Sequence, residues 1–235
     1  MPASQLLSKE YAASRAATID ANHATPSTEL DEEPAAINEG DNTTHFSIVD
    51  RDGNRVAATL SINTPFGSGF VAGETGVLLN NEMDDFSVAP DAPNAYRLRS
   101  HSGNEIAPGK RPLSSMSPVF VEDERGILIL GTPGGSRIIS TILLAVLDYA
   151  DQPQIDLQAM LRAQRYHHQY LPDRVEIEPE GFSQEWIAKL QARGHVVTKS
   201  NRRWGNMQAV YIGKRSGHAQ AANDPRGQGG GLGWY

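Results

Sequence analysis

The sequence has no cysteine among its 235 residues, and this absence excludes disulfide bonds, thiol catalysis and cysteine-ligated metal sites. It also has no apolar run approaching 18 residues, so it offers no candidate for a membrane-spanning helix. The first residues lack both a basic region and an apolar region of the kind that makes a secretory signal. With 39% apolar residues, the chain is long enough to build one sizeable core.

Basic residues are scarce at the amino-terminal end. Residues 1–42 contain two basic and eight acidic side chains, a net charge of −6, out of −7 for the whole chain. Binding to nucleic acid requires clustered Lys and Arg, and the short Arg202-Arg203-Trp204 cluster is too small to supply them. The composition therefore argues against a nucleic-acid partner.

What the chain does contain is an Asn42-Thr43-Thr44 junction, where a polar run meets a segment rich in β-branched and aromatic residues. A Thr hydroxyl is a weak nucleophile, but a chain-terminal Thr carries a base in its own α-amino group, whose pKa is about 7.7 to 8.0. The hypothesis is a precursor that cleaves itself before Thr43 and then uses Thr43 as nucleophile. By itself, the motif is also typical of an ordinary turn into a strand.

Four longer motifs, in order along the chain, support the hypothesis that Thr43 is a nucleophile. They are Thr43-Thr44-His45-Phe46-Ser47, Asn80-Asn81-Glu82-Met83-Asp84-Asp85-Phe86, the run from Lys110 to Pro118, and Gly131-Thr132-Pro133-Gly134-Gly135-Ser136-Arg137. Together they resemble the small subunit of γ-glutamyltranspeptidases, the glutathione hydrolases, from about Ser8 to Tyr235. The resemblance implies an α+β fold, the αββα sandwich of N-terminal-nucleophile hydrolases.

The resemblance also implies the catalytic residues. Cleavage falls between Asn42 and Thr43, and Thr43 is then the nucleophile. Ser61 stands where most relatives carry Thr; it keeps the hydroxyl that hydrogen-bonds the nucleophile but loses the stiffness of a β-branched side chain. Gly134 and Gly135 lie at a strand-to-helix turn, where converging N–H groups and a helix N-terminus form the parts of an oxyanion hole.

Substrate-binding residues follow from the same resemblance. Asp85 and Glu82 are expected to hold the α-ammonium group of a γ-glutamyl substrate, with help from Asn63. Some relatives have Gln at the position of Glu82. Ser114 and Ser115 are two adjacent hydroxyls that can both donate to the substrate's α-carboxylate. Without the resemblance, each of these residues is more simply explained as part of a turn or a solvated surface.

A long polar segment, residues 87–110, is expected to be a loop or a lid. Relatives with a lid have a Tyr at the position of Tyr96 that closes over the substrate, and a lid predicts a covered site with restricted acceptors. An ordinary surface Tyr is the alternative.

Hydrophobic periodicity predicts the remaining elements. Helices are expected over 5–21, 138–147, 156–164 and 183–192, and strands over 44–49, 55–62, 77–79, 119–121, 126–130, 174–177, 195–198 and 208–212. The segment 77–79 is expected to be buried, and 23–42 to be extended and mobile. The adjacent His167 and His168 are interpreted as structural, because no acidic or His partner stands at ligand spacing.

The resemblance divides the chain into residues 1–42, the tail of a large subunit, and residues 43–235, a small catalytic subunit. The expected function is that of a γ-glutamyltransferase and glutathione hydrolase without metal or organic cofactor, which transfers the glutamyl group to water, amino acids or peptides. The expected partner is the rest of the large subunit, and the expected location is periplasmic or extracellular. The alternatives are a cephalosporin or glutaryl acylase of the same fold and a catalytically silent fragment.

Overall fold

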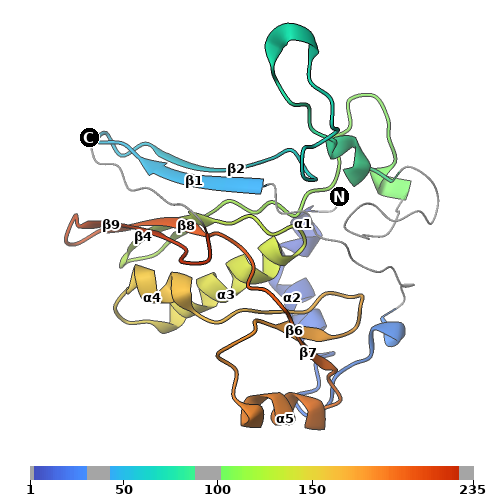
Figure 1. The fold of residues 1–235 in the computed structure, drawn as a ribbon. Coiled ribbons are helices and arrows are strands. Elements are labelled where there is room, and N and C mark those ends of the chain that lie inside the picture. Colours follow the sequence, from blue (N-terminus) through green and yellow to red (C-terminus); the bar gives the residue numbers. More distant parts are fainter. Residues whose placement is uncertain (1–2, 31–42, 88–101, 228–235) are drawn as a thin grey trace.

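The computed structural model describes residues 3–30, 43–87 and 102–227 (Figure 1). Its first sheet is a hairpin of strands β1 (Thr43–Val49) and β2 (Arg55–Ser61), paired so that Thr43 faces Ser61. In the turn, the Asp50 carboxylate accepts the backbone N–H groups of Asp52 and Asn54. The strands expected over 44–49 and 55–62 are confirmed, and they pair as a hairpin. Its turn is stabilised by Asp50, because an Asp side chain can bond nearby backbone N–H groups.

The second sheet has four antiparallel strands in the order β3-β4-β8-β9. Their bounds are Val119–Glu122 for β3, Gly126–Gly131 for β4, Gln208–Gly213 for β8 and Ala219–Asn223 for β9. Every residue of β4 is buried, because other parts of the chain cover both faces of this strand. Sequence periodicity missed β9, whose Ala-rich segment has little β propensity of its own.

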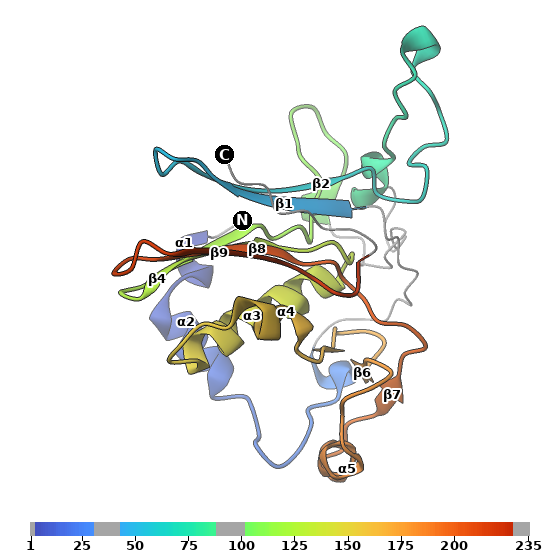
Figure 2. The ribbon, with the colours of Figure 1, turned by 60° about the vertical axis from the view of Figure 1, so that its left-hand side comes forward.

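The hairpin lies over one face of this sheet, and helices α3 (Arg137–Asp151) and α4 (Leu157–Arg162) cover the other (Figures 1 and 2). The main core fills the space between sheet and helices, with Leu128 and Leu130 of β4 packed in one cluster with Ile138, Ile142 and Tyr149 of α3. The described residues thus supply three layers, two sheets and one layer of helices.

A smaller sheet, in the order β5-β6-β7, extends beyond the helices (Figure 1). It contains β5 (Tyr166–His167), β6 (Val175–Ile177) and β7 (Val197–Lys199), and α5 (Gln184–Ala192) connects the parallel strands β6 and β7. Ser183 caps α5 by accepting the N–H of Trp186. Strand β5 was not predicted, because two residues are too few for a periodic signal.

The predicted helix over 5–21 is wrong in its continuity and length. The segment forms two short helices, α1 (Ala3–Leu6) and α2 (Lys9–Ala16), because the Ser8 side chain caps α2 by accepting the Tyr11 N–H. No residue of either helix is buried. The hydrophobic spacing therefore does not mark a packed face in this chain.

Part of the segment expected to be mobile is anchored. Ser27 begins a 3-10 turn, η1 (Ser27–Glu29), and is buried; its N–H donates to the Asp173 carboxylate at 2.7 Å. The N–H of Ala24 donates to the Arg193 carbonyl. The amino-terminal segment therefore rests against the region of β6 and α5.

The predicted buried strand over 77–79 is also wrong. Val77 and Leu79 are about half exposed, and only Leu78 forms an isolated bridge, to Val71. Short 3-10 turns surround this region: η2 (Gly73–Thr75), η3 (Glu82–Asp85) and η4 (Ser102–Asn104). Within the described residues, no helix has the length and hydropathy to cross a membrane.

Candidate active site

Thr43 is the first residue of β1, and its side chain meets Ser61 across the hairpin. The Thr43 hydroxyl donates to Ser61 Oγ at 3.0 Å, and Ser61 Oγ also accepts the backbone N–H of Asn63 at 2.9 Å. Because this register is set by the turn at the far end of the hairpin, the two hydroxyls are held together by strand pairing. Ser61 is therefore placed to orient the Thr43 oxygen.

Further along the inner face of the hairpin lies His45, which is buried between the two sheets. Its ring nitrogens contact Thr59 Oγ1 at 2.8 Å and Ser47 Oγ at 3.0 Å. Burial lowers the pKa of His45 to about 4, so the ring is neutral at pH 7. A Cβ added to Gly131 would stand 2.2 Å from the ring, so only glycine fits there. Sequence reasoning missed this contact, which joins residues 86 positions apart.

Behind Ser61, the chain is held in a tight bend by Asn63. Asn63 is buried with a φ of 68°, a left-handed conformation that Asn tolerates better than most residues. Its side-chain amide donates to the Asn81 carbonyl at 3.2 Å, and Asn81 Oδ1 accepts the N–H of Thr64. These bonds connect the end of β2 to the segment that carries Glu82 and Asp85.

Asp85 is a buried carboxyl on η3, the same turn as Glu82. Burial, followed by the nearby negative charge of Glu82, raises the pKa of Asp85 to about 7. A buried carboxyl beside a negative charge is harder to ionise than a carboxyl in water. A bound cation would relieve this repulsion, so the pair is suited to an ammonium group.

Ser114 and Ser115 lie on a second wall of the cleft described below, formed by the segment before β3. Asn104 links the two walls: its amide donates to the Asp85 carbonyl at 2.7 Å, and its Oδ1 accepts the Leu113 N–H at 2.9 Å. An Asn inside a polar loop gives no sequence signal for such a bridge. Asn104 therefore fixes the serine segment relative to the carboxyl pair.

Gly134 and Gly135 connect β4 to α3 with φ values of 140° and 55°. Their carbonyls accept the N–H groups of Arg137 and Ile138, each at 3.1 Å, and so begin the first turn of α3. Within the part of the chain that the structure describes, neither glycine N–H donates to another protein group. An anion beside α3 could therefore accept both N–H groups and benefit from the helix dipole.

One cleft gathers most of these residues and has an empty volume of about 360 Å³, including the space open to solvent. It is lined by Thr43, Ser61, Asn63, Glu82, Asp85, Leu113, Ser114, Ser115, Met116, Gly135 and Ile138. Gly134 is absent from the lining, although it precedes Gly135 directly. Asn42 and Tyr96 lie outside the described residues.

His167 and His168 do not line this cleft and have other contacts. His167 is buried, bonds Ser140 Oγ at 2.7 Å and Gln169 Oε1 at 2.9 Å, and has its pKa lowered by burial. His168 does have an acidic neighbour, Asp173 at 3.1 Å, contrary to the expectation from spacing. Both rings take part in local packing.

Comparison with known proteins decides the family. A family model described as gamma-glutamyltranspeptidase matches residues 1–234. The chain belongs to the γ-glutamyltranspeptidase family. It is 45% identical over 227 residues to a protein of Escherichia coli strain K12 named glutathione hydrolase proenzyme, and the match covers 96% of this chain but 38% of that relative. The chain thus spans well under half of the length of this curated relative.

Solved structures support the same family and its fold. A gamma-glutamyltranspeptidase from Pseudomonas nitroreducens complexed with L-DON is 40% identical with a TM-score of 0.71, covering 82% of this chain and all of that chain. A cephalosporin acylase from Bacillus halodurans, at 24% identity and a TM-score of 0.74, covers 100% of this chain and 40% of that chain, and shares the fold. The expected α+β fold of N-terminal-nucleophile hydrolases is confirmed for this member of the γ-glutamyltranspeptidase family.

Proposed function

We propose that this chain carries the catalytic centre of a γ-glutamyltransferase and glutathione hydrolase that is cut before Thr43. The observation that carries the proposal is the position of Thr43. It begins a strand, is hydrogen-bonded to Ser61, and lines a cleft that also contains a carboxyl pair, two serines and a glycine turn. The proposed nucleophile, ammonium acceptors and carboxylate donors thus line one cleft together with Gly135 of the glycine turn.

Maturation comes first in this proposal. Thr43 Oγ attacks the carbonyl carbon of Asn42, its proton passes to the departing nitrogen, and the peptide becomes an ester. Water then cleaves the ester, releases the Asn42 carboxylate and leaves Thr43 with a free α-amino group. Ser61, which accepts the Thr43 hydroxyl proton in a hydrogen bond, fixes the orientation of the attacking oxygen.

Substrate cleavage uses the same oxygen. Thr43 Oγ attacks the γ-amide carbon of glutathione or a related compound, while the α-amine takes the hydroxyl proton and passes it to the leaving amine. The oxyanion forms beside the N–H groups of Gly134 and Gly135. Water, an amino acid or a peptide then attacks the glutamyl ester, which regenerates Thr43. No metal or organic cofactor takes part.

Recognition of the glutamyl group is assigned to the two walls of the cleft. Asp85 and Glu82, with Asn63, bind the α-ammonium group, and Ser114 and Ser115 donate to the α-carboxylate. In this proposal the substrate's ammonium group lies near Asp85 and lowers the raised pKa of Asp85. Substrate binding therefore favours ionised Asp85, and ionised Asp85 favours substrate binding. An acylase that accepts glutaryl groups does not need this pair, because its substrate has no ammonium group.

The proposed partner is the rest of a large subunit, with residues 1–42 as its tail and 43–235 as the small subunit. Its support is the outer face of the hairpin, where Phe46, Ile48, Val56 and Leu60 are 41 to 50% exposed. An apolar sheet face of this kind is suited to cover by the fourth layer of an αββα sandwich. We also propose a periplasmic or extracellular location, on the family resemblance alone. Tyr96 is proposed as the closing residue of a lid.

Mass spectrometry and amino-terminal sequencing test maturation: pieces of 42 and 193 residues (235 minus 42) are expected. An intact chain would favour the silent alternative. Turnover of a chromogenic γ-glutamyl anilide, compared with its glutaryl analogue, tests substrate class. We expect the γ-glutamyl compound to be strongly preferred, and the opposite preference would identify an acylase.

A further inference from the structure

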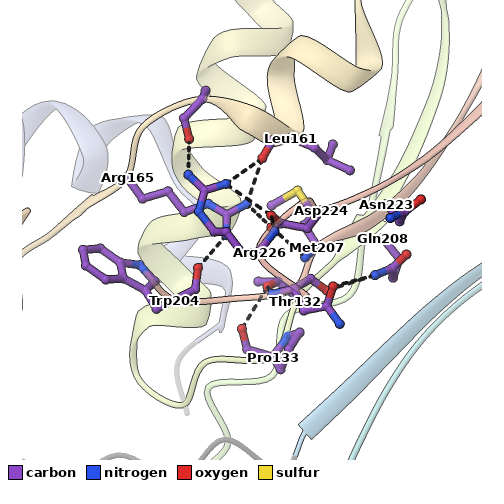
Figure 3. Close-up of polar contacts among 12 residues, drawn as sticks. Thr132, Pro133, Leu161, Arg165, Trp204, Met207, Gln208, Asn223, Asp224 and Arg226 are labelled. Atoms are coloured by element: carbon purple, nitrogen blue, oxygen red, sulfur yellow. Dashed lines mark hydrogen bonds and ion pairs between the residues drawn. The ribbon is translucent and has the colours of Figure 1, made fainter. Parts of the chain in front are cut away.

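We infer that Thr132 is a positioning residue that fixes the direction of the Gly134 N–H, and that a buried ion-pair cluster holds Thr132 in place through the segment 204–207. The inference rests on the proposed function, because it assigns this N–H to the oxyanion hole. It concerns residues that line no part of the cleft described above. Figure 3 shows the contacts involved.

The Thr132 side chain is fully buried, and its hydroxyl forms two hydrogen bonds. Its O–H donates to the Pro133 carbonyl at 2.8 Å, and its oxygen accepts the backbone N–H of Asn206 at 3.2 Å. A hydroxyl has one proton and two lone pairs, so both bonds can exist together. The peptide between Pro133 and Gly134 is planar, and its N–H points opposite to its C=O. Holding the Pro133 carbonyl therefore also aims the Gly134 N–H.

The Asn206 N–H is itself held from both sides. On one side, the Trp204 carbonyl accepts a bond from Arg165 Nη1 at 2.7 Å; on the other, the Met207 N–H donates to Asp224 Oδ2 at 3.0 Å. Arg165 and Asp224 are buried and form an ion pair with each other. The ion pair of Arg165 and Asp224 thus bonds the segment 204–207 on both sides of Asn206 (Figure 3).

Two further buried charges complete the cluster. Arg226 pairs with Glu178 at 2.6 Å, and the Glu178 carboxylate also accepts the backbone N–H of Arg165 at 3.1 Å. Because each charge has an opposite partner and further hydrogen bonds, the cluster can stay ionised in a dry environment. The residues around Asp224 therefore hold the segment 204–207, which contacts Thr132.

At Gly205, the backbone of the segment 204–207 packs closely against both Arg165 and Thr132. Its φ is 83°, and a Cβ added there would stand 2.6 Å from Arg165 Nη1 and 3.0 Å from Thr132 Oγ1. The backbone therefore passes directly between the charge cluster and Thr132. Trp204 also stacks with the guanidinium of Arg137, in the first turn of α3, at 4.8 Å. The segment contacts both ends of the glycine turn.

The test compares two variants of Thr132, Thr132→Val and Thr132→Ser. The matched control is Thr141→Val, because Thr141 is also a buried threonine and lies on α3. Valine keeps the shape and removes the hydroxyl; serine restores it. Turnover is measured with this chain together with the large-subunit polypeptide. We expect kcat to fall roughly 10- to 100-fold in Thr132→Val, less than the complete loss of an oxyanion donor, with KM changed less than threefold. Thr132→Ser should recover most of kcat, and Thr141→Val should leave it within twofold.

Amide hydrogen exchange of the 235-residue chain gives a second readout that needs no turnover. In Thr132→Val, the amides of Arg137 and Ile138, which donate to the carbonyls of the glycine turn, should exchange roughly tenfold faster than in Thr141→Val, relative to amides in β4. Equal exchange in both variants, or an equal loss of kcat in both, would overturn the inference. Failure of the wild-type protein to turn over any γ-glutamyl compound would count against the proposed function, and the exchange result would then decide this inference.

Discussion

The four-stranded sheet and the β1–β2 hairpin that lies over it differ in how far their apolar side chains are buried. In the four-stranded sheet, β4 is covered on both faces and all its residues are buried. In the β1–β2 hairpin, the face toward the protein carries Thr43, His45 and Ser61, whereas Phe46 and Ile48 point outward and are about half exposed. The four-stranded sheet is therefore expected to supply stability, whereas the hairpin offers the proposed catalytic face on one side and an exposed apolar face on the other.

The largest expected effect of any substitution is on activity and falls on the hairpin. Thr43→Ala should abolish self-cleavage and reduce γ-glutamyl turnover by a factor of roughly 10⁴ or more, because the attacking oxygen is lost. The free energy of unfolding should change little, since the pairing of β1 with β2 remains. Mass spectrometry, anilide turnover and urea unfolding measure the three quantities. Normal cleavage in this variant would contradict the role of Thr43.

The opposite outcome is expected in the four-stranded sheet. Leu128→Ala leaves a cavity in a core that excludes solvent, and we expect the free energy of unfolding to fall by about 2 to 5 kcal/mol. Anilide turnover at low temperature should remain near that of the wild type, because Leu128 lines no part of the cleft. A large fall in turnover without loss of stability would show that the two tasks are not separated.

A third prediction concerns pH. Asp85 has a pKa of about 7 in the folded chain against an ordinary value of 3.8, so the folded state binds the extra proton between these values. Its contribution to stability should therefore decrease as pH rises from about 4 to about 7, and KM for an ammonium-bearing substrate should rise as pH falls below about 7. Glu82→Gln removes the neighbouring charge.

In Glu82→Gln, the pKa of Asp85 should fall, and the acid limb of the KM profile should move to lower pH. Serine and carboxylate contacts elsewhere in the cleft are unchanged, so kcat should change little. A profile measured with the glutaryl analogue is the control, because this compound has no ammonium group. An acid limb that stays at the same pH in both proteins would contradict the coupling of the two carboxyls.

The smallest effect is expected on the outer face of the hairpin. Ile48→Thr keeps the β-branched shape that suits a strand, and it should change the free energy of unfolding of this chain by no more than about 0.5 kcal/mol. Association with a large-subunit polypeptide should weaken roughly tenfold, because an apolar contact is lost. Arg51→Ser, in the exposed turn, is the control. Unchanged association would show that this face is not the docking surface.

The sequence predicted local features well. The hairpin, the strand-turn-helix unit around Gly134 and the ends of α5 depend on neighbouring residues, so their signals are visible in short windows. The hydrogen bond between Thr43 and Ser61, which the resemblance implied, is present because a short turn fixes the register of β1 and β2.

Other features could not be predicted because they depend on distant partners. Gly131 against His45, Asn104 between the two walls, and Thr132 under the glycine turn all join residues far apart in sequence. The two wrong predictions, the helix over 5–21 and the buried strand over 77–79, have local causes that the hydrophobic pattern does not reveal. Ser8 divides one periodic segment into two helices, and the apolar side chains of Val77 and Leu79 stay largely exposed.

The ladder between β1 and β2 has its last rung at Thr43, opposite Ser61. The proposed cleavage before that residue breaks none of the strand pairs among the described residues, so Thr43 is already held by β2 when it becomes the new terminus. In that case the Thr43 hydroxyl needs no refolding to reach the position proposed for it.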